Sequence, residues 1–229
     1  MQHRVSLAGH GVRLVPLAPL QAEQLFPLID AELWSGMAAP RPETPEALAR
    51  LFAMRLNDPG ALPFAVAQDS VAEGSVAAGS IAADSVGTDS FADDMTGALI
   101  GTTGLYELNS EEGRTEVGGT FFGRAYWGSG ANDASKLLLL GHAFDALGLS
   151  RVGFRVDTRN RRSAKALLRM GAQYEGTLRS YRAMGQATMG AEARSDTAVF
   201  SVLDTEWSAV RARLLDRLAR RDETCRDAA

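Results

Sequence analysis

The chain has 229 residues, of which 45% are hydrophobic and 23% are charged, and its formal net charge at pH 7 is −4. These fractions are typical of a globular domain with a full core, and they exclude a wholly disordered or collagen-like chain. The single cysteine, Cys225, excludes an internal disulfide, and no apolar run approaches the length of a membrane span. We therefore expect a cytoplasmic protein without membrane contact, and the acidic balance argues against nucleic acid as a partner.

The hydrophobic pattern alternates between strand-like and helix-like segments along the chain. Strands are expected at residues 11–17, 62–67, 97–108, 115–122, 151–158, 173–184 and 197–203. Helices are expected at residues 19–30, from Pro45 onward, and at 130–147, 163–170 and 206–220. The turn signal at 109–113 predicts an antiparallel hairpin between the third and fourth strands. This order indicates the α/β (α+β) class, with a mixed sheet covered by helices.

Residues 69–93 interrupt this pattern with five pentapeptides, DSVAE GSVAA GSIAA DSVGT DSFAD. A period of five matches neither the two-residue repeat of a strand nor the 3.6-residue repeat of a helix, so no amphipathic face forms. The interval between Arg55 and Arg114 also holds ten acidic residues and no Lys or Arg. We interpret the repeat as an acidic, low-complexity loop insertion in a single domain of residues 1–229. An alternative is a module whose insertion binds a partner.

The first motif that carries chemistry is Tyr-Trp-Gly-Ser-Gly-Ala-Asn at 126–132, between a strand and a helix. Gly128 and Gly130 allow a tight turn, and the helix start presents free N–H groups with a partial positive charge. This combination favours a phosphate or pyrophosphate, to which Lys136 could add a cation. The alternative is a plain glycine-rich turn. The absence of Gly-Lys-Ser/Thr and of Gly-x-Gly-x-x-Gly argues against nucleoside triphosphate and hydride-cofactor chemistry.

The second motif lies about 30 residues later, where a strand ends and Asn160 opens a helix as its cap. That helix ends before Gly171. It and the residue before its cap carry five basic side chains, Arg159, Arg161, Arg162, Lys165 and Arg169. The basic residues are explained equally well as a solvated helix face or as ligands of an anion.

Together the two motifs resemble the GCN5-related N-acetyltransferase (GNAT) superfamily, in particular its RimJ/RimL-like branch. The resemblance implies a mostly antiparallel central sheet with a V-shaped cleft between strands 115–122 and 151–158. It implies acetyl-CoA as the co-substrate, and most relatives suggest a homodimer. The implied cofactor-binding residues are Thr120, Phe121, Phe122, Trp127, Gly128, Ser129, Gly130, Ala131, Asn132, Asn160 and Ser163.

The sequence departs from the family pattern at three residues. Trp127 stands where relatives carry a polar residue, and Asn132 stands where they carry the last small residue of the loop. Leu167 stands where many carry the tyrosine that protonates the leaving thiolate. Ser163 occupies the position of a serine suggested as the general acid in RimL-like enzymes. Because a serine hydroxyl is a weak acid, it is better suited to positioning the sulfur or relaying a proton through water. An ordinary polar residue in a first helical turn is the alternative.

The attacking amine must lose a proton, so a carboxylate should line the cleft. Glu116 is our first candidate for the base and Glu107 the second, because burial beside Val117 and Phe121 would raise the pKa of Glu116. The alternative is a surface carboxylate paired with arginine. No metal is expected, since the three histidines are far apart in the sequence and there is one cysteine.

The sequence thus predicts an N-acetyltransferase that moves the acetyl group of acetyl-CoA to a primary amine by direct attack in a ternary complex. That amine would belong to a protein N-terminus or a small molecule. The acceptor wall is expected from 34–45, 185–195 and the insertion, whose acidity hints at a cationic acceptor. The alternative is a non-catalytic acyl-CoA sensor on the same fold.

Overall fold

The computed structural model describes residues 3–37, 39–69, 97–183 and 194–227, so the pentapeptide repeat beyond Asp69 and most of the loop 185–195 lie outside the described residues. The strands are β1 (Leu7–Gly9), β2 (Val12–Pro16), β3 (Leu62–Gln68), β4 (Leu99–Asn109), β5 (Arg114–Phe122), β6 (Arg151–Asp157), β7 (Gln173–Ala183) and β8 (Arg194–Leu203). The α-helices are α1 (Ala22–Leu25), α2 (Ala31–Trp34), α3 (Pro45–Leu56), α4 (Ala131–Gly141), α5 (Arg161–Met170) and α6 (Asp204–Asp227).

All eight strands form one sheet in the order β1-β2-β3-β4-β5-β6-β8-β7. Every neighbouring pair is antiparallel except β5 and β6, which run parallel. The mixed, mostly antiparallel class is therefore confirmed. The β4–β5 hairpin is also confirmed, and its turn is held where the Glu112 amide donates to Asn109 Oδ1 at 2.9 Å.

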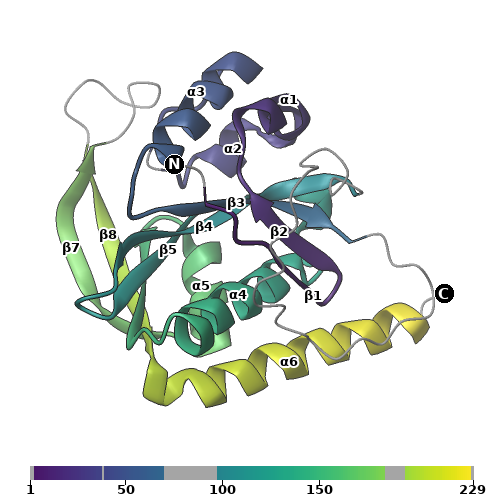
Figure 1. Cartoon of the computed structure of the whole chain (residues 1–229), viewed down its shortest axis with the longest axis vertical. Helices are drawn as coiled ribbons and strands as arrows, with labels where there is room; N and C mark the ends of the chain where they lie inside the picture. The colour runs from purple at the N-terminus through teal and green to yellow at the C-terminus, as the bar shows by residue number, and fades with distance from the viewer. Residues whose placement is uncertain (1–2, 38, 70–96, 184–193, 228–229) are drawn as a thin grey trace.

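Helices cover both faces of the sheet. Figure 1 shows α1, α2 and α3 on one face, and α4 and α6 on the other. Strand β3 is buried on both faces because its side chains alternate: Phe64 and Val66 enter the larger core with α4 and α6, whereas Ala65 and Ala67 enter the smaller core with α1 and α3. Within the described residues, no helix is both long and apolar enough to cross a membrane.

The structure differs from the sequence prediction at element ends. The helix expected at 19–30 is three short turns, 3₁₀ at Pro19–Gln21, α1, and 3₁₀ at Phe26–Leu28. Pro27 lacks the N–H group that would continue α1 as an α-helix. Helix α2 and strand β1 were missed. The α-helical part of 130–147 ends at Gly141 and continues as a π-helical turn, His142–Ala146, and α6 continues past residue 220 to Asp227.

Candidate functional site

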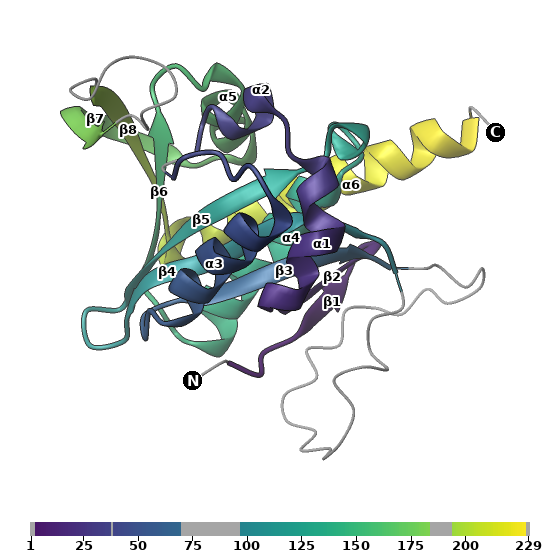
Figure 2. The same ribbon diagram turned by 90° about the horizontal axis from the view of Figure 1, so that it is seen from above.

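The site begins where the two parallel strands separate. Strands β5 and β6 pair only from Arg114–Arg151 to Glu116–Gly153, and beyond these pairs they diverge. Figure 2 shows β6 turning away from β5 toward α5. A cavity of about 490 Å³ opens in the gap, lined by residues 117–122 of β5 and 154–156 of β6. The V-shaped cleft expected from the resemblance is therefore present between the predicted strands.

A β-bulge shapes the β5 wall of this cavity. The register against β4 shifts between Thr102 and Gly104, and Gly119 adopts a left-handed φ of +58°. A Cβ atom at Gly119 would lie 2.5 Å from the Tyr106 hydroxyl oxygen, so only glycine fits without displacement. The Gly118-Gly119 pair thus lets β5 bend into the cleft, and Thr120, Phe121 and Phe122 follow it along the wall.

The predicted phosphate loop lies at the mouth of the cavity. Gly128 and Gly130 have φ values of +83° and +96°, and the N-cap Gly130 has no side chain. The Ala131 amide donates to Ser129 Oγ at 3.3 Å, which leaves the next amides of the first turn, those of Asn132 and Asp133, without a side-chain cap among the described residues. Gly128, Gly130 and Asn132 line the cavity, whereas Ser129 and Ala131 do not. The Ser129 hydroxyl donates to the Tyr126 carbonyl at 2.8 Å. The loop is therefore arranged to receive an anion at a helix start.

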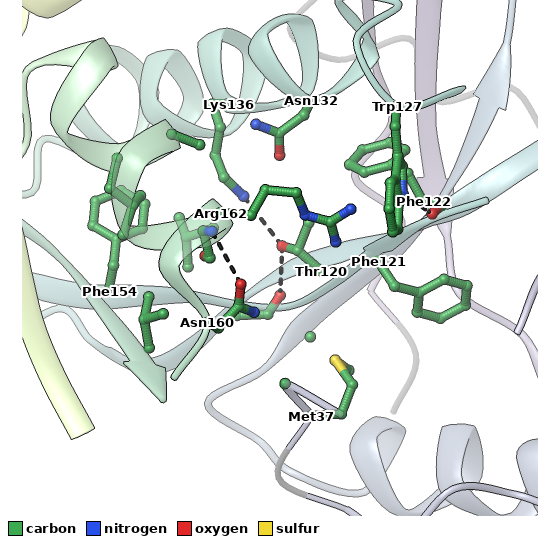
Figure 3. A pocket seen from close by; sticks show the side chains of 18 of the residues that line it. Met37, Thr120, Phe121, Phe122, Trp127, Asn132, Lys136, Phe154, Asn160 and Arg162 are labelled. Carbon is green, nitrogen blue, oxygen red and sulfur yellow. Dashed lines mark hydrogen bonds between the residues drawn. The ribbon is translucent and has the colours of Figure 1, made fainter. Parts of the chain in front are cut away.

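Trp127 has a structural position next to this loop. Its Nε1 donates to the Phe122 carbonyl at 2.8 Å, which ties the loop to the end of β5. The guanidinium of Arg162 lies 3.3 Å from the centre of the indole, and that of Arg124 lies 4.9 Å from it. Figure 3 shows the Arg162 side chain between Asn132 and Thr120, inside the cavity. The tryptophan in place of a polar residue thus holds an arginine at the phosphate-binding end.

Asn160 and Ser163 lie together on the β6 side of the cavity, as the motif predicted. Asn160 Oδ1 accepts from the Ser163 amide at 3.0 Å, so Asn160 is the N-cap of α5. Its Nδ2 faces Gly36, where an added Cβ would lie 2.4 Å away. Leu167 is buried and also lines the cavity, so the position of the family's tyrosine faces the cleft but carries no hydroxyl.

Lys136 is the deepest cation of the cavity. Its side chain is 6% exposed, and Nζ donates to Thr120 Oγ1 at 3.1 Å, which in turn contacts Thr103 Oγ1 at 2.8 Å. The nearby carboxylate of Asp133 is paired with Arg217 at 2.7 Å. Burial lowers the pKa of Lys136 to about 7, and the charge of Asp133 opposes this only in part. Lys136 points across the cleft to β5 (Figure 3), rather than into the phosphate loop.

Glu116 lies where β5 and β6 are still paired, and it does not itself line the cavity. Its Oε2 accepts from Arg155 Nε at 2.6 Å, and Arg155 also pairs with Glu107 and donates to the Tyr181 hydroxyl at 2.6 Å. Burial raises the pKa of Glu116, and Arg155 opposes the rise. The two candidate bases therefore share one arginine, which does line the cavity.

The structure is an α/β protein with a cleft between diverging parallel strands and a glycine-capped helix start at the mouth of that cleft, an arrangement suited to an extended, phosphate-bearing ligand. The acetyltransferase (GNAT) domain family matches residues 12–173, and the chain belongs to this family.

Two curated relatives agree with this assignment. The chain is 33% identical over 114 residues to the uncharacterized N-acetyltransferase p20 of Bacillus licheniformis, covering 49% of this chain and 60% of the relative. It is 40% identical over 86 residues to the uncharacterized N-acetyltransferase YoaA of Bacillus subtilis, covering 38% and 48%. The matched stretches thus span about half the length of these relatives.

Solved structures extend the likeness to nearly the whole chain. A protein of T. thermophilus classed as an acetyltransferase is 32% identical, with a TM-score of 0.75 over 95% of this chain and 99% of that one. The spermidine N-acetyltransferase of Vibrio cholerae, solved with CoA and spermine, is 16% identical with a TM-score of 0.63 over 87% and 99%. At that identity the likeness concerns the fold alone.

The sequence reasoning missed three features of the cavity. Arg55 on α3, Arg182 on β7 and Arg217 on α6 all line it, although none belongs to a motif. Lys136 lies four residues before the inward-facing Leu140, and this spacing was the available signal that it faces the protein interior.

Within the described residues, no group of three or more His, Cys, Asp or Glu side chains could hold a metal ion.

Proposed function

We propose that the protein transfers the acetyl group of acetyl-CoA to a primary amine by direct attack in a ternary complex. The observation that carries the proposal is the N-terminus of α4, capped by a glycine, at the mouth of the β5–β6 cleft. The first-turn amides of α4 would bind the pyrophosphate, and Arg162 and Arg217 would add positive charge there. The β5 backbone at 120–122 and the Asn160 amide would align the pantetheine arm.

In the chemical step, the nitrogen lone pair of the amine forms a bond to the thioester carbonyl carbon and the carbon–sulfur bond breaks. We assign Glu116 as the base that accepts the amine proton, through a water molecule, because burial raises its pKa and so makes the carboxylate a stronger base than an exposed one. The thiolate gains a proton relayed by Ser163. Holding the two reactants in one cleft supplies much of the rate.

We further propose that the chain belongs to the RimJ/RimL-like branch, and the support for this is Ser163, which follows Asn160 by three residues. One observation favours the alternative of a non-catalytic acyl-CoA sensor: Leu167 lines the cleft at the position of the family's tyrosine. The sensor would bind acetyl-CoA without turnover.

The test is a thermal melt of the purified protein with acetyl-CoA, CoA or NAD⁺, followed by an assay of free CoA thiol with a panel of amines. Binding to the native state raises the melting temperature, and NAD⁺ serves as the control because it has a pyrophosphate but no pantetheine arm. We expect a shift with acetyl-CoA, none with NAD⁺, and thiol release with at least one amine. A shift without release would support the sensor, and no shift would refute both functions.

A further inference from the structure

The wall of the cavity is strongly basic. Among the described residues that line it are eight arginine or lysine side chains and one acidic residue, Asp133, which is already paired with Arg217. Four of the arginines, Arg162, Arg169, Arg217 and Arg221, belong to α5 or α6. The phosphates of an extended ligand at the start of α4 account for positive charge at that end.

The remaining arginines come from other elements. Arg55 belongs to α3, Arg155 to β6 and Arg182 to β7, and α3 lies on the face of the sheet opposite α6 (Figure 1). Arg155 is matched by the carboxylates of Glu116 and Glu107. Arg55 and Arg182 therefore need a separate explanation, because Arg55 belongs to a helix on the face of the sheet opposite α4 (Figure 1) and Arg182 belongs to β7, the last strand of the sheet.

Arg55 meets Tyr106 above the β5 bulge. A Cβ atom at Gly119 would lie 2.5 Å from the Tyr106 hydroxyl oxygen and 3.2 Å from Arg55 Nη1, so both atoms adjoin one point of the cavity wall. Arg55 lines the cavity and Tyr106 does not, but the two side chains are neighbours, and the charge of Arg55 opposes the rise that burial causes in the pKa of Tyr106. Both atoms are buried, and in the part of the chain that the structure describes neither has a hydrogen-bond partner of good geometry. Buried donors of this kind are nearly always satisfied, so a ligand atom that accepts hydrogen bonds is expected beside them.

Arg182 extends this set of donors toward the candidate base. It is half-buried, and within the described ranges it forms neither a hydrogen bond nor an ion pair; burial lowers its pKa, as does the neighbouring charge of Arg155. Glu116 lies near Arg182 and directly opposite Tyr106 in the β4–β5 register, so these side chains share one face of the sheet. Arg55, Tyr106 and Arg182 can each donate a hydrogen bond at this side of the cavity, and among the described residues none of these three donors has a hydrogen-bond partner of good geometry.

The apolar part of the same region limits the ligand further. Leu33 on α2, Met37 after it and Leu51 on α3 line the cavity beside Arg55. An occupant must therefore combine an acceptor-rich anion with an apolar group. A planar carboxylate suits a guanidinium and a neighbouring hydroxyl, because its two oxygens can accept from both at once.

We propose that the acceptor is a free amino acid with an apolar side chain, whose carboxylate is bound by Arg55, Tyr106 and Arg182 while its amine faces the Glu116 side. This inference rests on the proposed function, and it names the substrate of that site. It runs against the hint from the acidic insertion, which favours a cationic acceptor. Binding the carboxylate also sets the distance between the amine and the thioester, since both ends of the acceptor are held.

The experiment compares phenylalanine, phenylalaninamide and phenethylamine, which share a ring and an amine but differ at the carboxyl group, with spermidine as a cationic amine. Thiol release is measured for each with acetyl-CoA, and thermal shifts are measured for each with the CoA-loaded protein. We expect phenylalanine to be preferred by about tenfold or more in kcat/KM. The amine of phenylalaninamide is less basic than that of phenylalanine, so more of it is unprotonated and reactive at neutral pH. A preference for phenylalanine would therefore come from recognition of its carboxylate and not from the reactivity of its amine.

Two variants test the assignment of the arginines. Arg55→Gln and, separately, Arg182→Gln should raise the KM for phenylalanine by about tenfold or more, leave the KM for acetyl-CoA unchanged, and reduce the preference over the amide. Arg221→Gln, at the other end of the cavity, is the matched control and should change only the KM for acetyl-CoA. Because Arg182 lies on a different element, β7, its variant keeps the test valid if Arg55→Gln does not fold.

The outcomes separate the two proposals. If phenylalaninamide or spermidine is turned over at least as fast as phenylalanine, the proposed acetyltransferase function is supported and the proposed carboxylate site is overturned. Loss of turnover with every amine would contradict the proposed function. In that case a thermal shift with phenylalanine but not with its amide would still support the carboxylate site, and no shift would overturn it.

Discussion

Replacing Lys136 with methionine removes a buried amine while keeping an unbranched side chain of similar length. In the folded protein burial lowers the pKa of Lys136 to about 7 from an ordinary value of 10.5, so the folded state resists protonation that the unfolded chain accepts. Between these two values the unfolded state binds more protons, and the stability of the wild type must therefore rise with pH.

The size of this effect follows from the two pKa values. Linkage gives a cost of about 5 kcal/mol at pH 6, where the folded and the unfolded protein both hold the proton, and about 2 kcal/mol at pH 9. Lys136→Met removes the cost at both values. We expect the variant to be more stable than the wild type, by a margin that narrows by about 3 kcal/mol between pH 6 and pH 9.

The assay is urea unfolding of both proteins at pH 6, 7, 8 and 9, with the free energy of unfolding compared at each pH. Lys165→Met is the matched control, because Lys165 is exposed on α5 and its replacement should shift stability equally at every pH. Equal pH slopes for the wild type and Lys136→Met would refute the reasoning, since they would mean that Lys136 keeps its proton in the folded state throughout this range.

Three further substitutions test the site. Asn160→Ala removes the cap of α5 and should lower the free energy of unfolding by about 1 kcal/mol in urea; an unchanged value would show that water replaces the cap. Gly119→Ala puts a methyl group 2.5 Å from the Tyr106 hydroxyl, at a residue whose φ is +58°. The variant should therefore have a lower melting temperature and a smaller thermal shift with acetyl-CoA. Unchanged values would show that the bulge does not lie at Gly119. Glu116→Gln should lower kcat and flatten its rise with pH, and Glu107→Gln should not; the reverse result would assign the base to Glu107.

The elements with a clear period or a strong punctuating residue were predictable from the sequence. The start of α4 after Gly130, the cap of α5 at Asn160 and the β4–β5 hairpin depend on local chemistry, and local chemistry is what a sequence displays. The helix at 19–30 was predicted wrongly as one piece because its spacing is helical, although Pro27 lies inside it.

The composition of the cleft was less predictable, because it depends on which distant residues meet. Glu116 could be recognised as half-buried, yet its partner Arg155 is 39 residues away and belongs to the strand that separates from β5. Arg55 and Tyr106 meet only because α3 packs across the bulge. Whether Glu116 is the base and Ser163 the relay stays a prediction.

The parting of β5 and β6 creates an internal edge in the sheet. Along residues 117–122, the side of β5 that faces the cleft has no neighbouring strand, so its backbone groups there are available to a ligand. An exposed strand edge can pair with a strand of another protein chain, but this edge lies inside the cavity, where only a narrow, extended ligand can reach it. The edge therefore selects ligands by peptide-like chemistry, since an extended molecule with its own amide groups can pair with it and a rigid or amide-free molecule cannot. Amide hydrogen exchange along β5 should consequently slow when such a ligand binds, while exchange along the fully paired β3 stays the same.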